Sequence, residues 1–245
     1  MNSQPTQPGA LSPCSNSSQN GPAPAILRRG RHFPRLVPED DRDQFINVLA
    51  ALERYVDRTG KAIGFCGCSH RSGTTSVALS FFHVITELGA EGSLLVEANL
   101  RSPSLEAALR LDAGPGFAAL LDASVTVEQV ARPFGSTDAR VIPAGISTAE
   151  SGGPRNPERI RTLVDSLREQ AQLVVFDLPP LTLYPDSAIV APHLDGVVLV
   201  LEAERDRWEV SALAKRVLET ARAQILGAVV NKQRRYIPGW LYRML

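Results

Sequence analysis

The chain has 245 residues, of which 44% are hydrophobic and 21% are charged, and its formal net charge at pH 7 is zero. This composition is typical of a soluble globular protein with a sizeable core, and the balanced charge gives no reason to expect a nucleic-acid partner. Three cysteines make no disulfide framework and suit a reducing compartment. The N-terminus lacks a signal-peptide pattern, and no apolar run approaches the roughly 20 residues that span a bilayer, so we expect a cytoplasmic protein.

The two ends of the chain differ in composition from its middle. Residues 1–38 are rich in Pro, Ser, Asn, Gln and Gly, which predicts a disordered arm because such a segment buries too little apolar surface to offset its ordering entropy. Residues 233–245 form a tail in which aromatic residues alternate with arginines. Such a tail suits a membrane interface, a partner groove or packing against its own domain. Between the ends we expect one folded domain, residues 39–232.

Within this domain, apolar runs alternate with helical patterns, beginning with a helical pattern over residues 39–58. Apolar runs typical of strands follow at 62–66, 93–98, 139–144, 173–177, 196–202 and 225–231, and helical stretches lie at 75–88, 105–111, 127–131, 157–170, 187–193 and 207–223. Because continuous apolar strands are buried on both faces, this order predicts an α/β fold, a three-layer α/β/α doubly wound, mostly parallel sheet. Such sheets bind ligands at the C-terminal ends of their strands.

The loop after the first strand, residues 67–75, reads GCSHRSGTT and leads into a helix. Strand, small-residue loop and helix form a phosphate cradle, because the amides at a helix N-terminus favour an anion. A phosphate-binding loop (P-loop) reads G-x-x-x-x-G-K-[ST]. Here Gly73 matches the last glycine and Thr75 the magnesium-binding hydroxyl, whereas Thr74 stands at the lysine position and Cys68 at the first glycine.

The replaced lysine bears directly on catalysis, because a cation beside a transferring phosphoryl group contributes several kcal/mol. Two interpretations stay open: a loop that still binds nucleotide weakly, with Arg71 as one substitute for the lysine, or a vestigial loop that shapes a turn. Under the first interpretation the loop residues that bind nucleotide are Arg71, Ser72, Gly73, Thr74 and Thr75.

The order of motifs resembles that of the bacterial tyrosine kinases of capsule and exopolysaccharide synthesis (BY-kinases of the CpsD/CapB type), in the MinD/ParA-like branch of P-loop NTPases. That family has a loop of roughly S-x-x-P-G-E-G-K-S-T and, after the second strand, D-x-D-x-R-x-P. This chain has Glu97, Asn99, Arg101 and Pro103 at the second motif. Residues 173–181, LVVFDLPPL, resemble the Walker B strand. Further segments at 115–130, 141–145, 156–167, 186–210 and 225–232 also match, so the similarity covers about residues 42–235.

The resemblance implies that the loop binds ATP or ADP with magnesium held by Thr75 and Asp177, and that Asp177 and Glu97 are the catalytic carboxylates. It also implies nucleotide contacts from Arg101 and, near the base, from Asn231. Structural alternatives stay open for two of these residues. Asp177 can fix the loop that follows its strand, and Asn231 with the next residue can be a polar pair where strand meets loop.

The resemblance further implies a tyrosine-kinase-like protein of exopolysaccharide or capsule biosynthesis that regulates polymerisation or export with a membrane chain-length (co-polymerase) partner. In that family the kinase phosphorylates a tyrosine cluster in its own tail, whereas this tail has only Tyr236 and Tyr242. With the degenerate Walker A loop, this leaves a weak kinase and a pseudokinase both open. The alternatives are a non-catalytic adaptor of the envelope machinery and a MinD/ParA-like positioning ATPase. Homo-oligomers, and peripheral contact of the tail with the inner face of the cell membrane, are further expectations.

Overall fold

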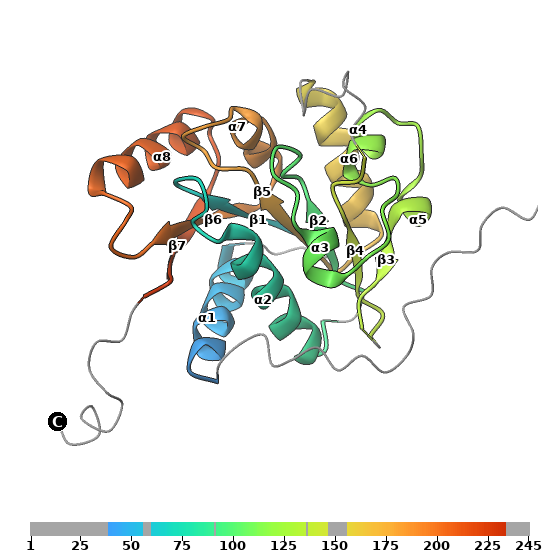
Figure 1. Ribbon diagram of the computed structural model, residues 1–245, viewed down its shortest axis with the longest axis horizontal. Coiled ribbons are helices and arrows are strands. Elements are labelled where there is room, and N and C mark those ends of the chain that lie inside the picture. The colour runs from blue at the N-terminus through green and yellow to red at the C-terminus, as the bar shows by residue number, and fades with distance from the viewer. Residues whose placement is uncertain (1–38, 56–59, 91, 136, 147–155, 234–245) are drawn as a thin grey trace, which may run out of the picture.

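The computed structural model describes residues 39–55, 60–90, 92–135, 137–146 and 156–233 (Figure 1). They contain a seven-stranded sheet with the strand order β3-β4-β2-β5-β1-β6-β7. All neighbouring strands are parallel except β3, which runs antiparallel to β4 at the edge. The strands are β1 Lys61–Gly67, β2 Leu94–Glu97, β3 Arg132–Pro133, β4 Arg140–Ile142, β5 Leu173–Leu178, β6 Gly196–Glu202 and β7 Ile225–Asn231.

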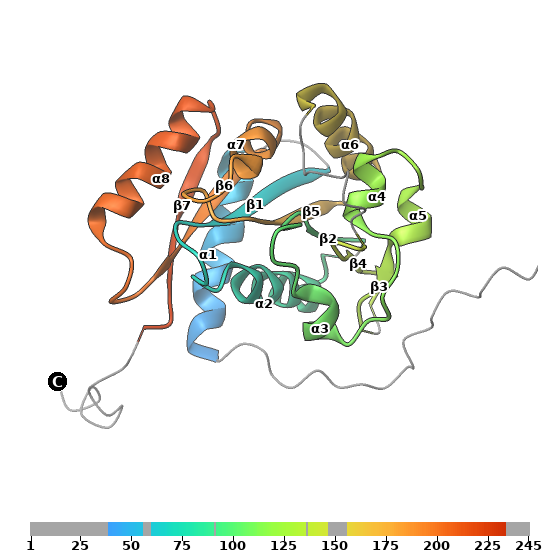
Figure 2. The ribbon, with the colours of Figure 1, turned by 45° about the horizontal axis from the view of Figure 1, so that its top comes forward.

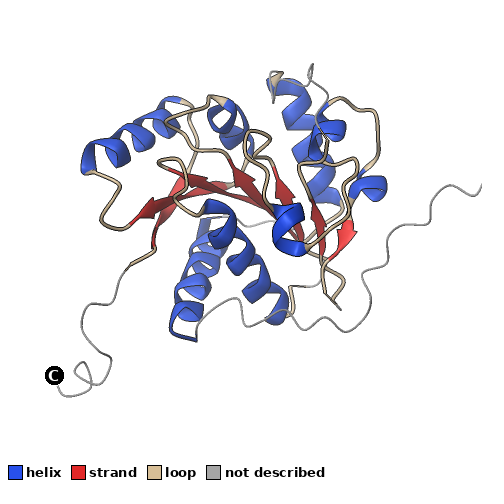
Figure 3. Cartoon of the chain, viewed as in Figure 1, coloured by secondary structure: helices blue, strands red, loops and turns tan. Residues whose placement is uncertain are grey.

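Helices cover both faces of this sheet (Figures 1 and 3). Helices α1, α2 and α3 pack on one face, and α4, α5, α6, α7 and α8 pack on the other. The predicted three-layer, mostly parallel α/β fold is therefore confirmed. The helices are α1 Glu39–Tyr55, α2 Thr74–Glu87, α3 Leu105–Leu109, α4 Phe117–Leu121, α5 Val127–Val130, α6 Pro157–Glu169, α7 Asp186–Val190 and α8 Trp208–Thr220, with a 3-10 turn at Ala191–His193.

The core has two halves because successive side chains of a buried strand point to opposite faces. In β1, Ile63 and Phe65 face the layer of α1 and α2, where the Phe65 ring lies 5.1 Å from that of Phe81. Ala62 and Cys66 face the opposite layer. Burial raises the pKa of the Cys66 thiol to about 12, so this cysteine is an inert part of the core.

The sheet brings the candidate motifs to one edge. Parallel strands end on the same side, and in the register Glu97 of β2 lies beside Asp177 of β5, which in turn lies beside Phe65 of β1. The loop between β1 and α2 therefore has the ends of β5 and β2 on one side and those of β6 and β7 on the other (Figure 2).

The sequence pattern missed two short elements. Helix α4 has only five residues, and β3 has two, one of them Pro133, so neither is long enough to show a period. The first helix is described as far as Tyr55. The expected arm of residues 1–38 and the tail beyond Gln233, with Tyr236 and Tyr242, lie outside the described residues. Among the described helices, none has the length and apolar character that crossing a membrane requires.

Candidate functional site

The loop between β1 and α2 has the backbone of an anion cradle. Gly73, the residue before α2, has a φ of +85°, and Arg71 has a φ of +65°, so the loop turns through two left-handed positions. Within the described part of the chain, no hydrogen bond from the backbone N–H groups of residues 73–76 to a protein acceptor is seen, whereas the N–H of Val77 donates to the carbonyl of Gly73. Free amides converging at the start of a 14-residue helix favour a phosphate group.

A second feature of the site is the contact between Thr75 and Asp177. The Thr75 hydroxyl donates to Oδ2 of Asp177 at 2.6 Å, while Oδ1 of this carboxyl group is buried without a hydrogen-bond partner among the described residues. Burial, together with the nearby charge of Glu97, raises the pKa of Asp177 to about 8 against the lowering effect of the Thr75 hydrogen bond. The carboxyl group is thus poised to ionise when a cation comes close.

These two residues fit a magnesium ion that arrives with a nucleotide. Magnesium keeps few protein ligands in such sites and takes oxygen atoms from substrate phosphates. The unpartnered Oδ1 of Asp177 and the hydroxyl of Thr75 supply oxygen ligands, and no cluster of three His, Cys, Asp or Glu in the described residues would hold a metal alone. When bound, the ion would neutralise phosphate charge.

Glu97 is buried and turned towards the backbone. Its Oε1 accepts from the N–H groups of Ser104 at 2.5 Å and Leu105 at 2.8 Å, and its Oε2 accepts from that of Ala144 at 3.0 Å. Burial raises the pKa of Glu97, and the three N–H donors oppose this rise. The carboxylate predicted to be catalytic therefore ties the start of α3 and the segment after β4 to the end of β2, and both of its oxygens are engaged by backbone N–H groups.

Arg101 is also engaged away from the loop. Its Nε lies 3.0 Å from Oδ2 of the buried Asp186, and its guanidinium lies 5.3 Å from the ring centre of Tyr184. The Asp186 hydrogen bond raises the pKa of Arg101. Asn99, next to the loop, accepts a hydrogen bond from the backbone of Ser102 at 3.2 Å. The motif after β2 thus stabilises its own turn and the segment after β5.

The loop borders a pocket of about 270 Å³. Segments that follow β1, β2, β5 and β7 line it, as expected for a site at the C-terminal ends of the strands. The predicted loop residues Arg71, Ser72, Gly73, Thr74 and Thr75 all line this pocket, together with His70, Ser76, Asn99, Ser102, Ser104, Pro180, Tyr184 and Lys232.

Thr74, at the position where a P-loop has lysine, is turned inwards. Its hydroxyl lies 3.2 Å from that of Ser72, and both side chains are buried. A Cβ atom on Gly67 would lie 2.7 Å from the Thr74 hydroxyl and 2.3 Å from that of Ser72. The glycine at the end of β1 thus makes room for two hydroxyls under the loop, and the first residue of α2 brings no positive charge to the pocket.

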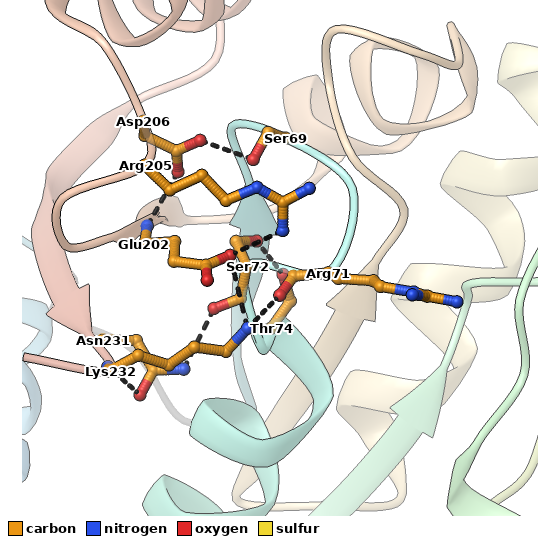
Figure 4. A network of polar contacts seen from close by, with 9 residues as sticks. All are labelled: Ser69, Arg71, Ser72, Thr74, Glu202, Arg205, Asp206, Asn231 and Lys232. Atoms are coloured by element: carbon orange, nitrogen blue, oxygen red, sulfur yellow. Dashed lines mark hydrogen bonds and ion pairs between the residues drawn. The ribbon is translucent and has the colours of Figure 1, made fainter.

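The end of β7 holds the opposite side of the loop (Figure 4). The Asn231 amide donates to the carbonyl of Ser72 at 2.9 Å, so the residue predicted to lie near the base is bonded to the loop itself. The Lys232 ammonium donates to the carbonyl of Arg71 at 2.6 Å and lies 3.2 Å from Oε2 of Glu202. The resemblance pairs Lys232 with Asn231 near the base, but Lys232 is not among the nucleotide-binding residues predicted from the sequence.

The loop geometry depends most directly on Gly73. A Cβ atom there would lie 2.2 Å from the Asn231 amide nitrogen, in addition to the strain of a φ of +85°. We expect Gly73→Ala to destabilise the fold by about 2–4 kcal/mol. Gly89→Ala is the matched control, because Gly89 has a φ of +88° but open space around its Cβ position, and should cost about 1 kcal/mol. Urea unfolding measures both, and equal costs would contradict the contact with Asn231.

Solved structures with a similar fold indicate the class of protein to which this fold belongs. The chimerical protein CapA2B2 superimposes with a TM-score of 0.71 at 20% identity, covering 86% of this chain and 95% of that one. The septum site-determining protein MinD of Pyrococcus horikoshii OT3, complexed with Mg-ADP, gives a TM-score of 0.61 at 18% identity over 75% of this chain and 76% of its own. The fold is therefore that of the MinD/ParA-like P-loop NTPases, as predicted.

Sequence comparison narrows the class. No family model matches the chain. The tyrosine-protein kinase YwqD of Bacillus subtilis (strain 168) is 25% identical over 190 residues, 77% of this chain and 80% of the relative. The protein EpsB of Ralstonia nicotianae is 27% identical over 214 residues, 83% of this chain, but the match spans only 27% of EpsB. The resemblance to bacterial tyrosine kinases that the motifs indicated is thus confirmed.

Proposed function

We propose that this chain is a nucleotide-binding, tyrosine-kinase-like protein of exopolysaccharide or capsule biosynthesis that transfers phosphoryl groups poorly or not at all. The proposal rests on one observation: the loop combines a site for phosphate and magnesium with the absence of the lysine. Free amides and the Thr75–Asp177 pair form a site for phosphate and magnesium, while Thr74 offers no cation to the transferring group. Such a site favours binding over catalysis, because the missing cation would stabilise the transition state of phosphoryl transfer more than the bound nucleotide.

The similarity to kinases and to a Mg-ADP-bound ATPase supports the choice of ligand. We propose ATP or ADP with magnesium, held by Thr75 and Asp177 and by the amides of residues 71–75. Asp177 keeps its place beside the metal site, whereas Glu97 and Arg101 act through the shape of the surrounding turns. This division of roles separates the two carboxylates predicted to be catalytic.

The wider role follows from the resemblance. We propose a cytoplasmic protein, peripheral at the inner face of the cell membrane, that regulates polymerisation or export together with a membrane chain-length protein and as part of a homo-oligomer. The folded unit, residues 39–232, would carry the nucleotide site, with residues 1–38 and 233–245 as accessory ends. A purely structural adaptor differs from this proposal in one respect: it binds no nucleotide.

Thr74→Lys tests the catalytic half of the proposal. A lysine at this position brings a cation to the phosphates, so we expect ATP to bind roughly tenfold more tightly and tyrosine phosphorylation to become detectable. Transfer of labelled phosphate from ATP, followed by phosphotyrosine detection, measures the gain. Thr74→Val is the matched control, since it keeps the branched shape without charge. Wild-type transfer equal to that of Thr74→Lys would contradict the assignment of Thr74 as the catalytic defect.

A further inference from the structure

The loop lacks a positive charge at a position where bound nucleotide calls for one. A nucleoside triphosphate carries several negative charges, and the dipole at the N-terminus of a helix offsets only about half of one unit charge. Thr74, at the start of α2, is uncharged and directs its hydroxyl to Ser72. Beyond the magnesium ion, positive charge for the phosphates therefore has to come from another residue of the site.

Of the other cations around the loop, two are engaged elsewhere, and Arg71, which also lines the pocket, extends away from Lys232 (Figure 4). Arg101 is bonded to Asp186 and stacked over Tyr184. Arg205 pairs with Oε2 of Glu202 at 3.0 Å. The side chain of Arg71 extends away from the cluster formed by Glu202, Asn231 and Lys232 (Figure 4).

Lys232 reaches the loop from the end of the edge strand β7. It follows the last residue of β7 and has a φ of +59°, and its own N–H donates to the Asn231 side chain. Its side chain runs beside Gly73, since a Cβ atom there would lie 3.7 Å from Cε of Lys232. The ammonium lies at the loop, 2.6 Å from the carbonyl oxygen of Arg71, and the residue lines the 270 Å³ pocket.

The ammonium group has bonding capacity left. It has three N–H donors; one reaches the carbonyl of Arg71 and another faces Glu202 at 3.2 Å. The third has no acceptor among the described residues. The side chain is 44% exposed, so a ligand can approach it. Lys232 can thus donate a hydrogen bond to a phosphate oxygen without releasing the carbonyl of Arg71.

We propose that Lys232 supplies, for nucleotide binding and not for phosphoryl transfer, the cation that the loop lacks, so that an ammonium from the end of β7 contacts the phosphates of a bound nucleoside di- or triphosphate. This inference rests on the proposed function, because it requires nucleotide at the loop. Glu202, which Lys232 shares with Arg205, holds the ammonium in place while the site is empty.

The first test compares Lys232→Gln with Lys215→Gln, a control on α8 whose lysine lies 3.5 Å from Glu219. Calorimetric titration with Mg-ATP and Mg-ADP, and displacement of ATP by inorganic triphosphate, give the affinities. We expect Lys232→Gln to weaken ATP, ADP and inorganic triphosphate by about 10–100-fold, and Lys215→Gln to change none by more than about twofold. The loss should shrink at high salt, as a charge contact does.

A double-variant cycle separates a phosphate contact from a purely structural latch. If both cations serve the same phosphates, Thr74→Lys restores most of the affinity lost in Lys232→Gln and gains less in the wild-type chain. If Lys232 only holds the loop through the Arg71 carbonyl, Thr74→Lys gains the same in both chains. Arg71→Gln, which keeps that carbonyl, should weaken ATP less than Lys232→Gln does.

Each outcome decides between defined claims. Nucleotide binding by the wild-type chain that Lys232→Gln leaves within about twofold overturns this proposal alone, as does a larger loss in Arg71→Gln or equal gains in the cycle. Absence of nucleotide binding by the wild-type chain overturns the proposed function and this inference with it. A loss for all three phosphate ligands with rescue by Thr74→Lys supports both.

Discussion

Replacing Asp177 with asparagine should stabilise the nucleotide-free protein and abolish the effect of magnesium on nucleotide affinity. Asparagine keeps an acceptor for the Thr75 hydroxyl, which lies 2.6 Å from Oδ2 of Asp177 in the wild-type chain. It also removes a buried carboxyl group. Among the described residues, that group faces no cation, and its Oδ1 has no hydrogen-bond partner. The variant therefore no longer bears the free-energy cost of burying a carboxyl group, and it also lacks a ligand for the metal.

The pH dependence follows from the raised pKa of Asp177, about 8 against 3.8 in an unfolded chain. Between about pH 4 and pH 8 the folded protein keeps a proton that the unfolded chain has lost, so this group lowers the unfolding free energy as the pH rises. The advantage of Asp177→Asn over the wild-type chain should thus grow across this range to roughly 2–5 kcal/mol. Urea unfolding at pH 5 and pH 8, in EDTA, measures it.

Asp186→Asn is the matched control for this prediction. Asp186 is also buried but faces Arg101 at 3.0 Å, so neutralising it removes a charge-assisted hydrogen bond and should destabilise the fold. Opposite signs for the two substitutions are the expected result. If Asp177→Asn destabilises the chain at pH 8, or leaves the magnesium effect on ATP affinity intact, then Asp177 is structural and the metal site lies elsewhere.

The second large effect is expected for Glu97→Ala. The wild-type carboxylate accepts from three backbone N–H groups that belong to two separate segments, at Ser104, Leu105 and Ala144. Alanine leaves all three without this acceptor, and each unsatisfied buried donor costs about 1–3 kcal/mol. We expect a loss of about 3–5 kcal/mol, or about 10 °C in Tm for a chain of this size.

Glu97→Gln distinguishes the structural role from a catalytic one. Its amide oxygen can still accept from Ser104 and Leu105, but its NH₂ group then meets the N–H of Ala144, so an intermediate loss is expected. Thermal unfolding, with the exposed Glu209→Ala as control, ranks the three variants. A change below about 1 kcal/mol in Glu97→Ala, combined with a lost magnesium effect, would instead support the catalytic role that the family motif implies.

Much of the fold could be predicted because its signals are local. The strands β1, β5 and β6 are buried on both faces and read as continuous apolar runs. Helix α6 has Asn156 as a cap whose side chain accepts from the backbone of Glu158 and Arg159. Helix α4, by contrast, is too short to show a helical period and depends on packing against α6 and the sheet.

The site could be predicted only where its chemistry lies within one motif. The loop is predictable because phosphate cradles have a fixed strand-loop-helix order, and Asp177 follows from the resemblance of residues 173–181 to the Walker B strand. One partner of Glu97, Ala144, lies 47 positions further along the chain, and the Arg71 carbonyl lies 161 positions from Lys232, so no local pattern encodes these two contacts. The tertiary fold decides whether a carboxylate faces a metal or a backbone amide.

The most direct test of the account is calorimetric titration of the full chain with Mg-ATP at pH 8, where Asp177 ionises more readily than at pH 7. We predict a dissociation constant in the micromolar range for the wild-type chain, loss of binding in Asp177→Ala, and no tyrosine phosphorylation in the same samples. No detectable heat or saturation at millimolar Mg-ATP would contradict nucleotide binding and leave a structural adaptor. Efficient tyrosine phosphorylation by the wild-type chain would contradict the loss of catalysis.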